Sequence, residues 1–195
     1  MKKYLKNLLL TLVGYLIFMN QSIASENYPQ VEIVTTSGTF TIELDRNRAP
    51  ISVENFLNYV QEGFYKNTIF HRVIEGFVIQ SGGYTTEFEI KETKPEIVNE
   101  SGNGLSNRRM SLGMARSNEP HSASSQFYIN LADNFSLNPM PTRWGYTVFG
   151  EVISGFEVVD AIGQSATQTF QGLQDVPVAP IIILEAKKLT SEKNR

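Results

Sequence analysis

The sequence predicts a mainly β protein in which one antiparallel β structure, closed or nearly closed, is covered by two α-helices. Three observations support this fold class. A hairpin pattern occupies residues 31–44, many short apolar segments of strand length follow it, and two isolated amphipathic helix patterns lie among them. No internal repeat, heptad array or linker divides residues 25–195, so we expect a single domain there, with a core from about 30 to 190.

The predicted strands begin with the hairpin, in which Phe40, Ile42 and Leu44 alternate with polar residues and Ser37-Gly38 forms the turn. Later segments share a short length and an apolar content, which predicts strands at residues 69–74, 77–81, 110–115, 125–131, 146–151 and 181–187. The polar segments 84–109 and 164–178 are expected to be surface loops.

The first predicted helix lies in the segment "APISVENFLNYVQEG", residues 49–63. Apolar residues recur there at i, i+3, i+4 and i+7 from Val53 to Val60. Pro50 suits the first helical turn, and Gly63 suits the end of the helix.

The second predicted helix begins at Ser154, which forms a capping-box pattern with Glu157. It is expected to end at Gly163. The apolar face predicted to be buried consists of Phe156, Val159 and Ile162.

Residues 1–24 predict a secretory signal peptide rather than part of the fold. Three lysines precede the apolar stretch 8–18, which is shorter than the roughly 20 residues of a membrane span. Ser22 and Ala24 are small residues at the positions that a signal peptidase recognises. We expect cleavage after Ala24 and no membrane attachment afterwards; an uncleaved membrane anchor is the alternative.

Charge and cysteine content restrict the function. The whole chain has a formal net charge of −3, and loss of the three N-terminal lysines makes the mature domain more acidic. An acidic domain without a lysine-rich run does not suit nucleic-acid binding. The chain has no cysteine, which excludes disulfides, thiol catalysis and thiolate metal sites. Export without cysteine favours a bacterial periplasm.

Common catalytic motifs are absent from the sequence: it has no Walker phosphate loop, GxSxG, HExxH or calcium loop. A Ser-His-Asp triad assembled in space stays open, because its members need not be close in sequence. We expect Ser124 and Ser125 to be small residues leading into a strand, and His71 to be a core histidine with a hydrogen-bond partner. We expect no metal and no organic cofactor.

Arg72 is the unusual residue of the segment "FHRVIEGFVIQSGG", residues 70–83. In a continuous strand it would share a face with Phe70 and Ile74, and neither face of that strand is polar. A guanidinium keeps its charge, and burying it without a partner is costly. Its position therefore requires a specific role.

Arg72 has candidate companions in the neighbouring predicted strands: Phe77, Gln80, Gln126 and Tyr128. One permanent cation, two amides and aromatic rings would form an apolar pocket with a few convergent polar groups, suited to binding a peptide. A purely structural arginine stacked on a phenylalanine is the alternative.

The segments "FHRVIEGFVIQSGG", "MARSNEPHSASSQFYIN" and "YTVFGEV" together resemble the cyclophilin-type peptidyl-prolyl cis/trans isomerases. The similarity covers about residues 30–190 and is strongest to the periplasmic bacterial branch. It implies an eight-stranded antiparallel closed β-barrel capped by two α-helices. It also implies a monomeric rotamase whose partners are proline-containing unfolded or partly folded polypeptides.

The resemblance also implies roles for single residues. The implied catalytic residues are Arg72, Gln80 and Phe77, with Arg72 facing the twisted amide. The implied substrate-binding residues are Val78, Ala115, Arg116, Gln126, Tyr128, Leu137 and Tyr146. Val78, Tyr128 and Leu137 would line the proline pocket with Phe77, and Tyr146 would lie at its rim.

Some positions depart from the family pattern. Val78 replaces a common methionine, Tyr128 replaces phenylalanine, and Glu75 replaces proline. Ser136 replaces a tryptophan or phenylalanine, which leads us to expect weak cyclosporin binding. Two alternatives to an active isomerase are a peptide-binding or chaperone module with little turnover, and a β-barrel that binds a small apolar ligand.

Overall fold

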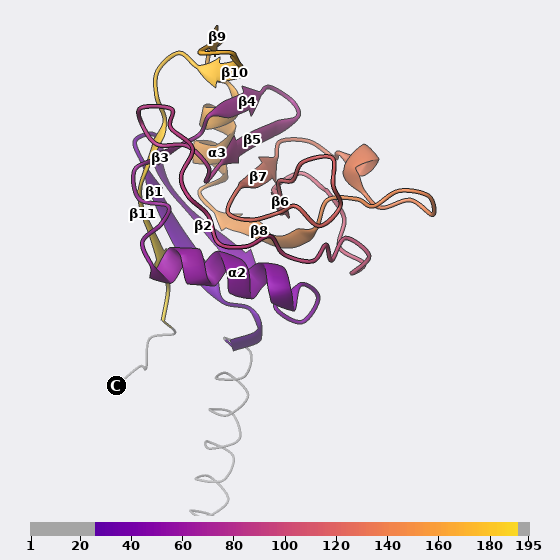
Figure 1. The fold of residues 1–195 in the computed structure, drawn as a ribbon. Helices are drawn as coiled ribbons and strands as arrows, with labels where there is room; N and C mark the ends of the chain where they lie inside the picture. Colours follow the sequence, from indigo (N-terminus) through magenta and orange to yellow (C-terminus); the bar gives the residue numbers. More distant parts are fainter. Residues whose placement is uncertain (1–25, 191–195) are drawn as a thin grey trace, which may run out of the picture.

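The computed structural model describes residues 26–190. These residues form a large antiparallel sheet, a separate hairpin, two α-helices and a 3₁₀ turn (Figure 1). The strands are β1 (Gln30–Thr35), β2 (Gly38–Leu44), β3 (Thr68–Ile69), β4 (Arg72–Ile74), β5 (Val78–Ser81), β6 (Ser111–Met114), β7 (Phe127–Asn130), β8 (Val148–Ser154), β9 (Thr167–Phe170), β10 (Leu173–Pro177) and β11 (Ile182–Lys188). The helices are α2 (Pro50–Gln61) and α3 (Phe156–Gly163), and the 3₁₀ turn is η1 (Phe135–Leu137).

The large sheet has nine strands in the order β3-β11-β1-β2-β8-β6-β7-β5-β4, and it curls without closing. The predicted fold class is thus confirmed, whereas the eight-stranded, strictly closed ladder was wrong. The edge strands β3 and β4 are separated in the chain only by Phe70 and His71, so the backbone itself bridges the gap. The Phe70 N–H donates to the Ile181 carbonyl at 2.9 Å, which attaches this bridge to β11.

This break also corrects the strand predicted at residues 69–74. Because the chain passes from one sheet edge to the other, simple alternation does not hold across Phe70 and His71. Both side chains are buried, and Arg72 is half-buried.

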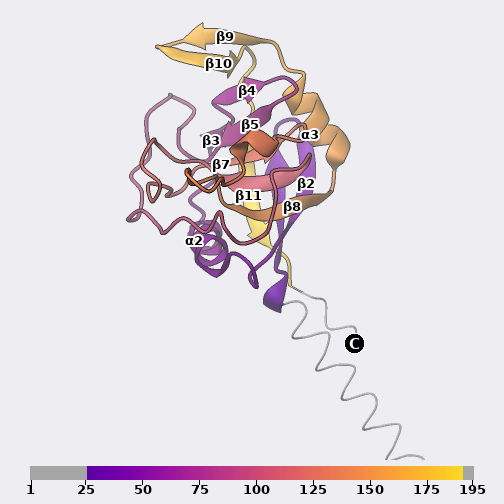
Figure 2. The ribbon, with the colours of Figure 1, turned by 90° about the vertical axis from the view of Figure 1, so that its right-hand side faces the viewer.

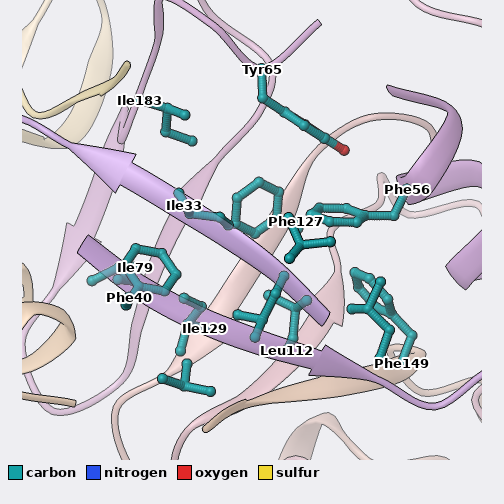
Figure 3. Close-up of a cluster of buried hydrophobic side chains, with 14 of the residues drawn as sticks. Ile33, Phe40, Phe56, Tyr65, Ile79, Leu112, Phe127, Ile129, Phe149 and Ile183 are labelled. Atoms are coloured by element: carbon teal, nitrogen blue, oxygen red, sulfur yellow. The ribbon is translucent and has the colours of Figure 1, made fainter. Parts of the chain in front are cut away.

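The interior of the curled sheet holds one aromatic and aliphatic core, part of which is drawn in Figure 3. The Phe56 ring of α2 lies 5.5 Å from Phe127 in an edge-to-face arrangement and 5.5 Å from Phe149. Helix α2 therefore covers one end of the core, while α3 packs against β2, β4 and β5. The two helices lie at opposite ends of the sheet in Figures 1 and 2.

The first helix is confirmed, with Pro50 in its first turn. The predicted start of the second helix was wrong, because β8 continues to Ser154 and pairs that residue with Thr41. The cap is Gly155 in a left-handed conformation with φ of 76°, and no side chain caps the helix. A Cβ at Gly155 would lie 2.5 Å from the Thr39 carbonyl oxygen, so only glycine fits this close turn.

The predicted burial of α3 needs one correction as well. Val159 and Ile162 are buried as expected, but Phe156 is 43% exposed. At 3.6 residues per turn, Phe156 lies about 120° from Ile162 around the helix axis, so it falls at the edge of the buried face.

Segment 164–178 was predicted as a loop and instead contains the hairpin β9–β10, which forms its own two-stranded sheet. All four residues of β9 are exposed, so no apolar alternation marks the strand. Its turn residues Gln171 and Gly172 both have positive φ, as a two-residue hairpin requires. Segment 84–109 has no strand of the sheets and makes only isolated bridges, as expected for a surface loop.

The predicted signal peptide and its cleavage site lie outside the described residues. Among the helices of residues 26–190, none has the length and apolar character needed to cross a membrane.

Candidate active site

The register of four adjacent strands separates a core row from a polar row. Val73, Ile79, Ile129 and Leu112 are successive partners across β4, β5, β7 and β6, and all belong to the core. The neighbouring row consists of Arg72, Gln80, Tyr128 and Gly113. Because side chains alternate along each strand, burying the first row places the second on the opposite face.

Arg72, Gln80 and Gln126 form a continuous hydrogen-bonded chain. The Arg72 Nη1 donates to Gln80 Oε1 at 3.3 Å, and Gln80 Nε2 donates to Gln126 Oε1 at 2.9 Å. All three side chains are half-buried. A guanidinium has five N–H donors, so this single side-chain contact leaves Arg72 with spare capacity for a ligand.

Two glycines create the space for this polar face. A Cβ at Gly113 would lie 2.3 Å from Tyr128 Cζ, and one at Gly83 would lie 2.5 Å from Gln126 Nε2. A glycine inside a strand often marks such a close approach, so "SLGMA" carried a signal that our sequence analysis did not use.

The Tyr128 hydroxyl, which required a partner, donates to Asn107 Oδ1 at 2.6 Å. Tyr128 is only 4% exposed, and burial raises the pKa of its phenol well above the usual value. Asn130 Nδ2 donates to the same Asn107 oxygen at 3.2 Å. Asn107 in turn donates through its Nδ2 to Asn138 Oδ1 at 3.0 Å. Tyr128 is therefore held from beneath by a buried asparagine network.

The same network fixes two residues of the expected proline pocket. Asn134 Nδ2 donates to Asn130 Oδ1 and to the Phe77 carbonyl, both at 2.8 Å. The Leu137 N–H donates to the Asn134 carbonyl at 2.9 Å. Phe77 and Leu137 are thus joined through Asn134, and both are half-buried.

Val78 pairs with Asn130 and is 3% exposed, so it can contribute only to the floor of a pocket. Ser136 is exposed in η1, next to Phe135, whose side chain is 52% exposed. Weak cyclosporin binding stays a prediction.

Arg116 and Tyr146 form an adjoining cluster. The Arg116 guanidinium lies 4.4 Å from the Tyr146 ring centre and donates to the carbonyls of Trp144 and Gly145. The Tyr146 ring meets Tyr128 edge-to-face, with centres 6.0 Å apart. The Arg116 side chain therefore connects the 144–146 segment to the residues that follow β6.

Ala115 has a narrower role than the resemblance implied. Its N–H already donates to the Gln126 carbonyl at 3.0 Å. The carbonyl of Ala115 is therefore the backbone group that it can offer to a peptide.

His71 is 5% exposed, so its core position is confirmed. The hydrogen-bond partner that we expected for His71 is not found at its Nδ1 atom, which forms no hydrogen bond within residues 26–190. Burial above all, together with the nearby charge of Arg72, lowers the pKa of His71 to about 4. His71 is therefore a neutral imidazole at neutral pH.

Ser124 and Ser125, the serines considered for a spatially assembled triad, take part in structural hydrogen bonds. The Ser125 hydroxyl donates to the Gly82 carbonyl at 2.7 Å, and Ser125 is fully buried. The Ser124 carbonyl accepts from Asn55 Nδ2. Within the described residues, no group of three or more His, Cys, Asp or Glu side chains could hold a metal ion.

A cavity of about 260 Å³ opens beside Arg72. The large sheet and its adjoining segments contribute one wall, and the β9–β10 hairpin contributes another. The lining residues are His71, Arg72, Gln80, Tyr84, Gln126, Leu173, Gln174 and Asp175. The hairpin wall was missed by sequence analysis, since its segment was predicted as a loop. This face thus offers a permanent cation and amide groups next to aromatic side chains, which suits binding of a polar planar group beside an apolar ring.

Comparison with known proteins identifies the family of the chain. The family model described as "Cyclophilin type peptidyl-prolyl cis-trans isomerase/CLD" matches residues 30–188. The chain belongs to this cyclophilin family. Its activity is accordingly cis-trans isomerisation of prolyl peptide bonds.

Relatives of this cyclophilin cover most of its length. Peptidyl-prolyl cis-trans isomerase cyp18 of Streptomyces antibioticus is 50% identical over 162 residues, covering 82% of this chain and 98% of the relative. Peptidyl-prolyl cis-trans isomerase A of Dickeya dadantii is 45% identical over 166 residues, covering 85% and 87%.

Solved structures agree with the fold. A cyclophilin-type isomerase of Cryptosporidium parvum, determined in the presence of the dipeptide Ala-Pro, superposes with a TM-score of 0.69 and 30% identity. The match covers 83% of this chain and 99% of the other.

Proposed function

We propose that Arg72 is the principal catalytic residue and that this cyclophilin accelerates prolyl isomerisation without a covalent step. Rotation about an Xaa–Pro bond faces a barrier of about 18–20 kcal/mol, because resonance keeps the amide planar. As the bond twists, the prolyl nitrogen becomes pyramidal and gains a lone pair. A fixed donor aimed at that lone pair interacts most strongly near the transition state, so it lowers the barrier.

The observation that carries this proposal is the state of Arg72. Its side-chain hydrogen bond goes to neutral Gln80, and the ion pairs found among residues 26–190 involve other side chains. A carboxylate bonded directly to the guanidinium would compete with the substrate for it, whereas an amide orients the guanidinium without forming an ion pair. Gln80 would thus position Arg72, and Gln126 would hold Gln80.

The remaining residues would bind the substrate. Phe77, Tyr128 and Leu137 would receive the proline ring, with Val78 in the floor and Tyr146 at the rim. Gln126 would contact the extended peptide through its amide, alongside the backbone of Ala115 and Arg116.

We also propose that the natural substrates are exported polypeptides that fold in a bacterial periplasm. The basic and apolar pattern of residues 1–24 and the absence of cysteine support this location. Expressing the whole chain and sequencing the N-terminus of the product would test it. A periplasmic product that begins at Ser25 is expected, and retention of Met1 on a membrane-bound product would contradict it.

The mechanism is tested by measuring exchange of a short Xaa–Pro peptide by NMR, which needs no coupling protease. Arg72→Ala should lower kcat/KM about 10²- to 10³-fold, as loss of one preorganised donor does. Arg72→Lys should restore little, because a lysine lacks the planar fork of donors. Arg108→Ala, at an exposed arginine away from the polar row, is the matched control.

Two outcomes separate the alternatives. Equal isomerisation rates for wild type and Arg72→Ala would show that Arg72 has a structural role rather than a catalytic one. Peptide binding without catalysis in either protein would favour the peptide-binding module.

A further inference from the structure

The β9–β10 hairpin forms a second, independently held wall of the cleft. It lies beside β4, the strand that carries Arg72, and has its own two-stranded ladder (Figures 1 and 2). At its tip, the Phe170 ring packs on Phe88 with centres 4.7 Å apart. The hairpin is therefore anchored to the 84–90 loop as well as to β4.

A bulge in this hairpin sets the position of Asp175. Leu173 pairs with Phe170 and Val176 pairs with Gln168, so the register shifts across Gln174 and Asp175. Asp175 has φ of 60°, a left-handed conformation that aspartate and asparagine tolerate better than most residues. Bulges of this kind redirect side chains and are common next to active sites.

Asp175 is a carboxylate without a cation. It is half-buried and lines the cavity together with Arg72, yet it takes part in none of the ion pairs formed among residues 26–190. His71, which also lines the cavity, is neutral at neutral pH because burial lowers its pKa. The cavity therefore has a cation on the wall formed by the large sheet and an available anion on the wall formed by the hairpin.

The size and charge of the cavity indicate its ligand. About 260 Å³ is below the roughly 300–1,000 Å³ of small-molecule pockets, so it suits one side chain of a bound peptide. A cationic side chain would be attracted to Asp175 and repelled by Arg72, which directs it toward the hairpin. An acidic side chain would instead compete for Arg72.

We propose that Asp175 is a specificity-determining residue that binds the lysine or arginine side chain of a residue flanking the substrate proline. This inference rests on the proposed use of the Arg72 face for Xaa–Pro substrates. A partly exposed ion pair of this kind predicts a preference of about fivefold in kcat/KM for a lysine peptide over its glutamate counterpart.

The test uses the purified protein and peptides that carry Lys, Gln or Glu at each position next to proline. NMR exchange gives kcat/KM, and NMR titration gives Kd separately. In the wild type we expect the Lys peptide to be favoured at one position, and the ratio to shrink in high salt. Asp175→Asn, which keeps a side chain suited to positive φ, should bring the Lys-to-Gln ratio close to one. Glu185→Gln, at an exposed acid on β11, should leave the ratio at its wild-type value.

Equal treatment of Lys and Glu peptides by the wild type would overturn the inference, as would an unchanged Lys-to-Gln ratio in Asp175→Asn. The failure of the proposed mechanism looks different. If Arg72→Ala keeps full turnover while the Kd preference depends on Asp175, the mechanism fails and the specificity role stands.

Discussion

Two polar networks meet at the row that contains Tyr128, and they differ in burial. Beneath Tyr128, Asn107 and Asn130 are fully buried and bond to one another. Beside it, the chain Arg72–Gln80–Gln126 is half-buried and ends at a guanidinium that takes part in none of the ion pairs formed within residues 26–190. The side chains of the first network are hydrogen-bonded to one another inside the protein. In the second network, the Arg72 guanidinium still has N–H groups that can donate to a ligand.

This difference separates stability from activity. A buried polar group that loses its partner pays the full cost of desolvation, so changes beneath Tyr128 should affect folding. Half-buried groups can turn to water instead, so changes in the Arg72 chain should affect the rate. Substitutions in each of the two networks can therefore test this difference.

The largest expected effect is that of Asn107→Ala. It removes the acceptor of the Tyr128 hydroxyl and of Asn130 Nδ2. Leaving these buried donors unsatisfied should lower the free energy of unfolding by about 3–4 kcal/mol, measured in urea. In a Tyr128→Phe background, Asn107→Ala should lower the free energy of unfolding by less, because the Tyr128 hydroxyl is no longer present as an unsatisfied donor. Equal costs in both backgrounds would refute the coupling.

A somewhat smaller effect concerns His71, which lies next to Arg72. Its pKa is about 4 in the folded protein, below the ordinary 6.5, so the unfolded chain binds the proton more tightly. Stability from this group is complete above pH 6.5 and falls as the pH decreases toward 4, by about 3 kcal/mol at pH 4. Urea unfolding between pH 7 and pH 4 should show a shallower decline for His71→Gln than for the wild type. Parallel pH curves for the two proteins would rule out this linkage.

The smallest expected effect on free energy is that of Gln80→Ala, which removes the side-chain partner of Arg72. Losing one charge-assisted hydrogen bond that orients the guanidinium should lower kcat/KM about tenfold. The free energy of unfolding should change by less than about 1 kcal/mol, because Gln80 is half-buried. Gln61→Ala, at an exposed glutamine of α2, is the control. A large loss of stability with an unchanged rate would show that Gln80 supports folding rather than the orientation of Arg72.

Sequence analysis succeeded where local patterns control structure. The β1–β2 hairpin and α2 follow from alternation and helical periodicity within single segments. The residue pattern and the resemblance both singled out Arg72, Gln80 and Gln126, and in the structure a pairing of β4 with β5 and two side-chain hydrogen bonds bring them together. Their catalytic and binding roles stay predictions.

The features that were missed depend on contacts between distant segments. Asn107 lies in a polar loop, and its partner Tyr128 is 21 residues away in sequence, so no local pattern marks it. The start of α3 depends on how closely Gly155 approaches β2. Asp175 reaches the cleft through a bulge in a hairpin without apolar alternation, and periodicity cannot reveal such a bulge.

The separate ladder of the β9–β10 hairpin makes the cleft modular. Its strands pair with each other and form no ladder with the nine-stranded sheet. Residues 167–177 can therefore be exchanged as a cassette without cutting a backbone hydrogen bond of the sheet that holds Arg72. If Asp175 sets specificity as proposed, exchanging this cassette should change substrate choice while the sheet that holds Arg72 keeps its structure, in the way that interchangeable loops on a fixed scaffold alter what a binding protein recognises.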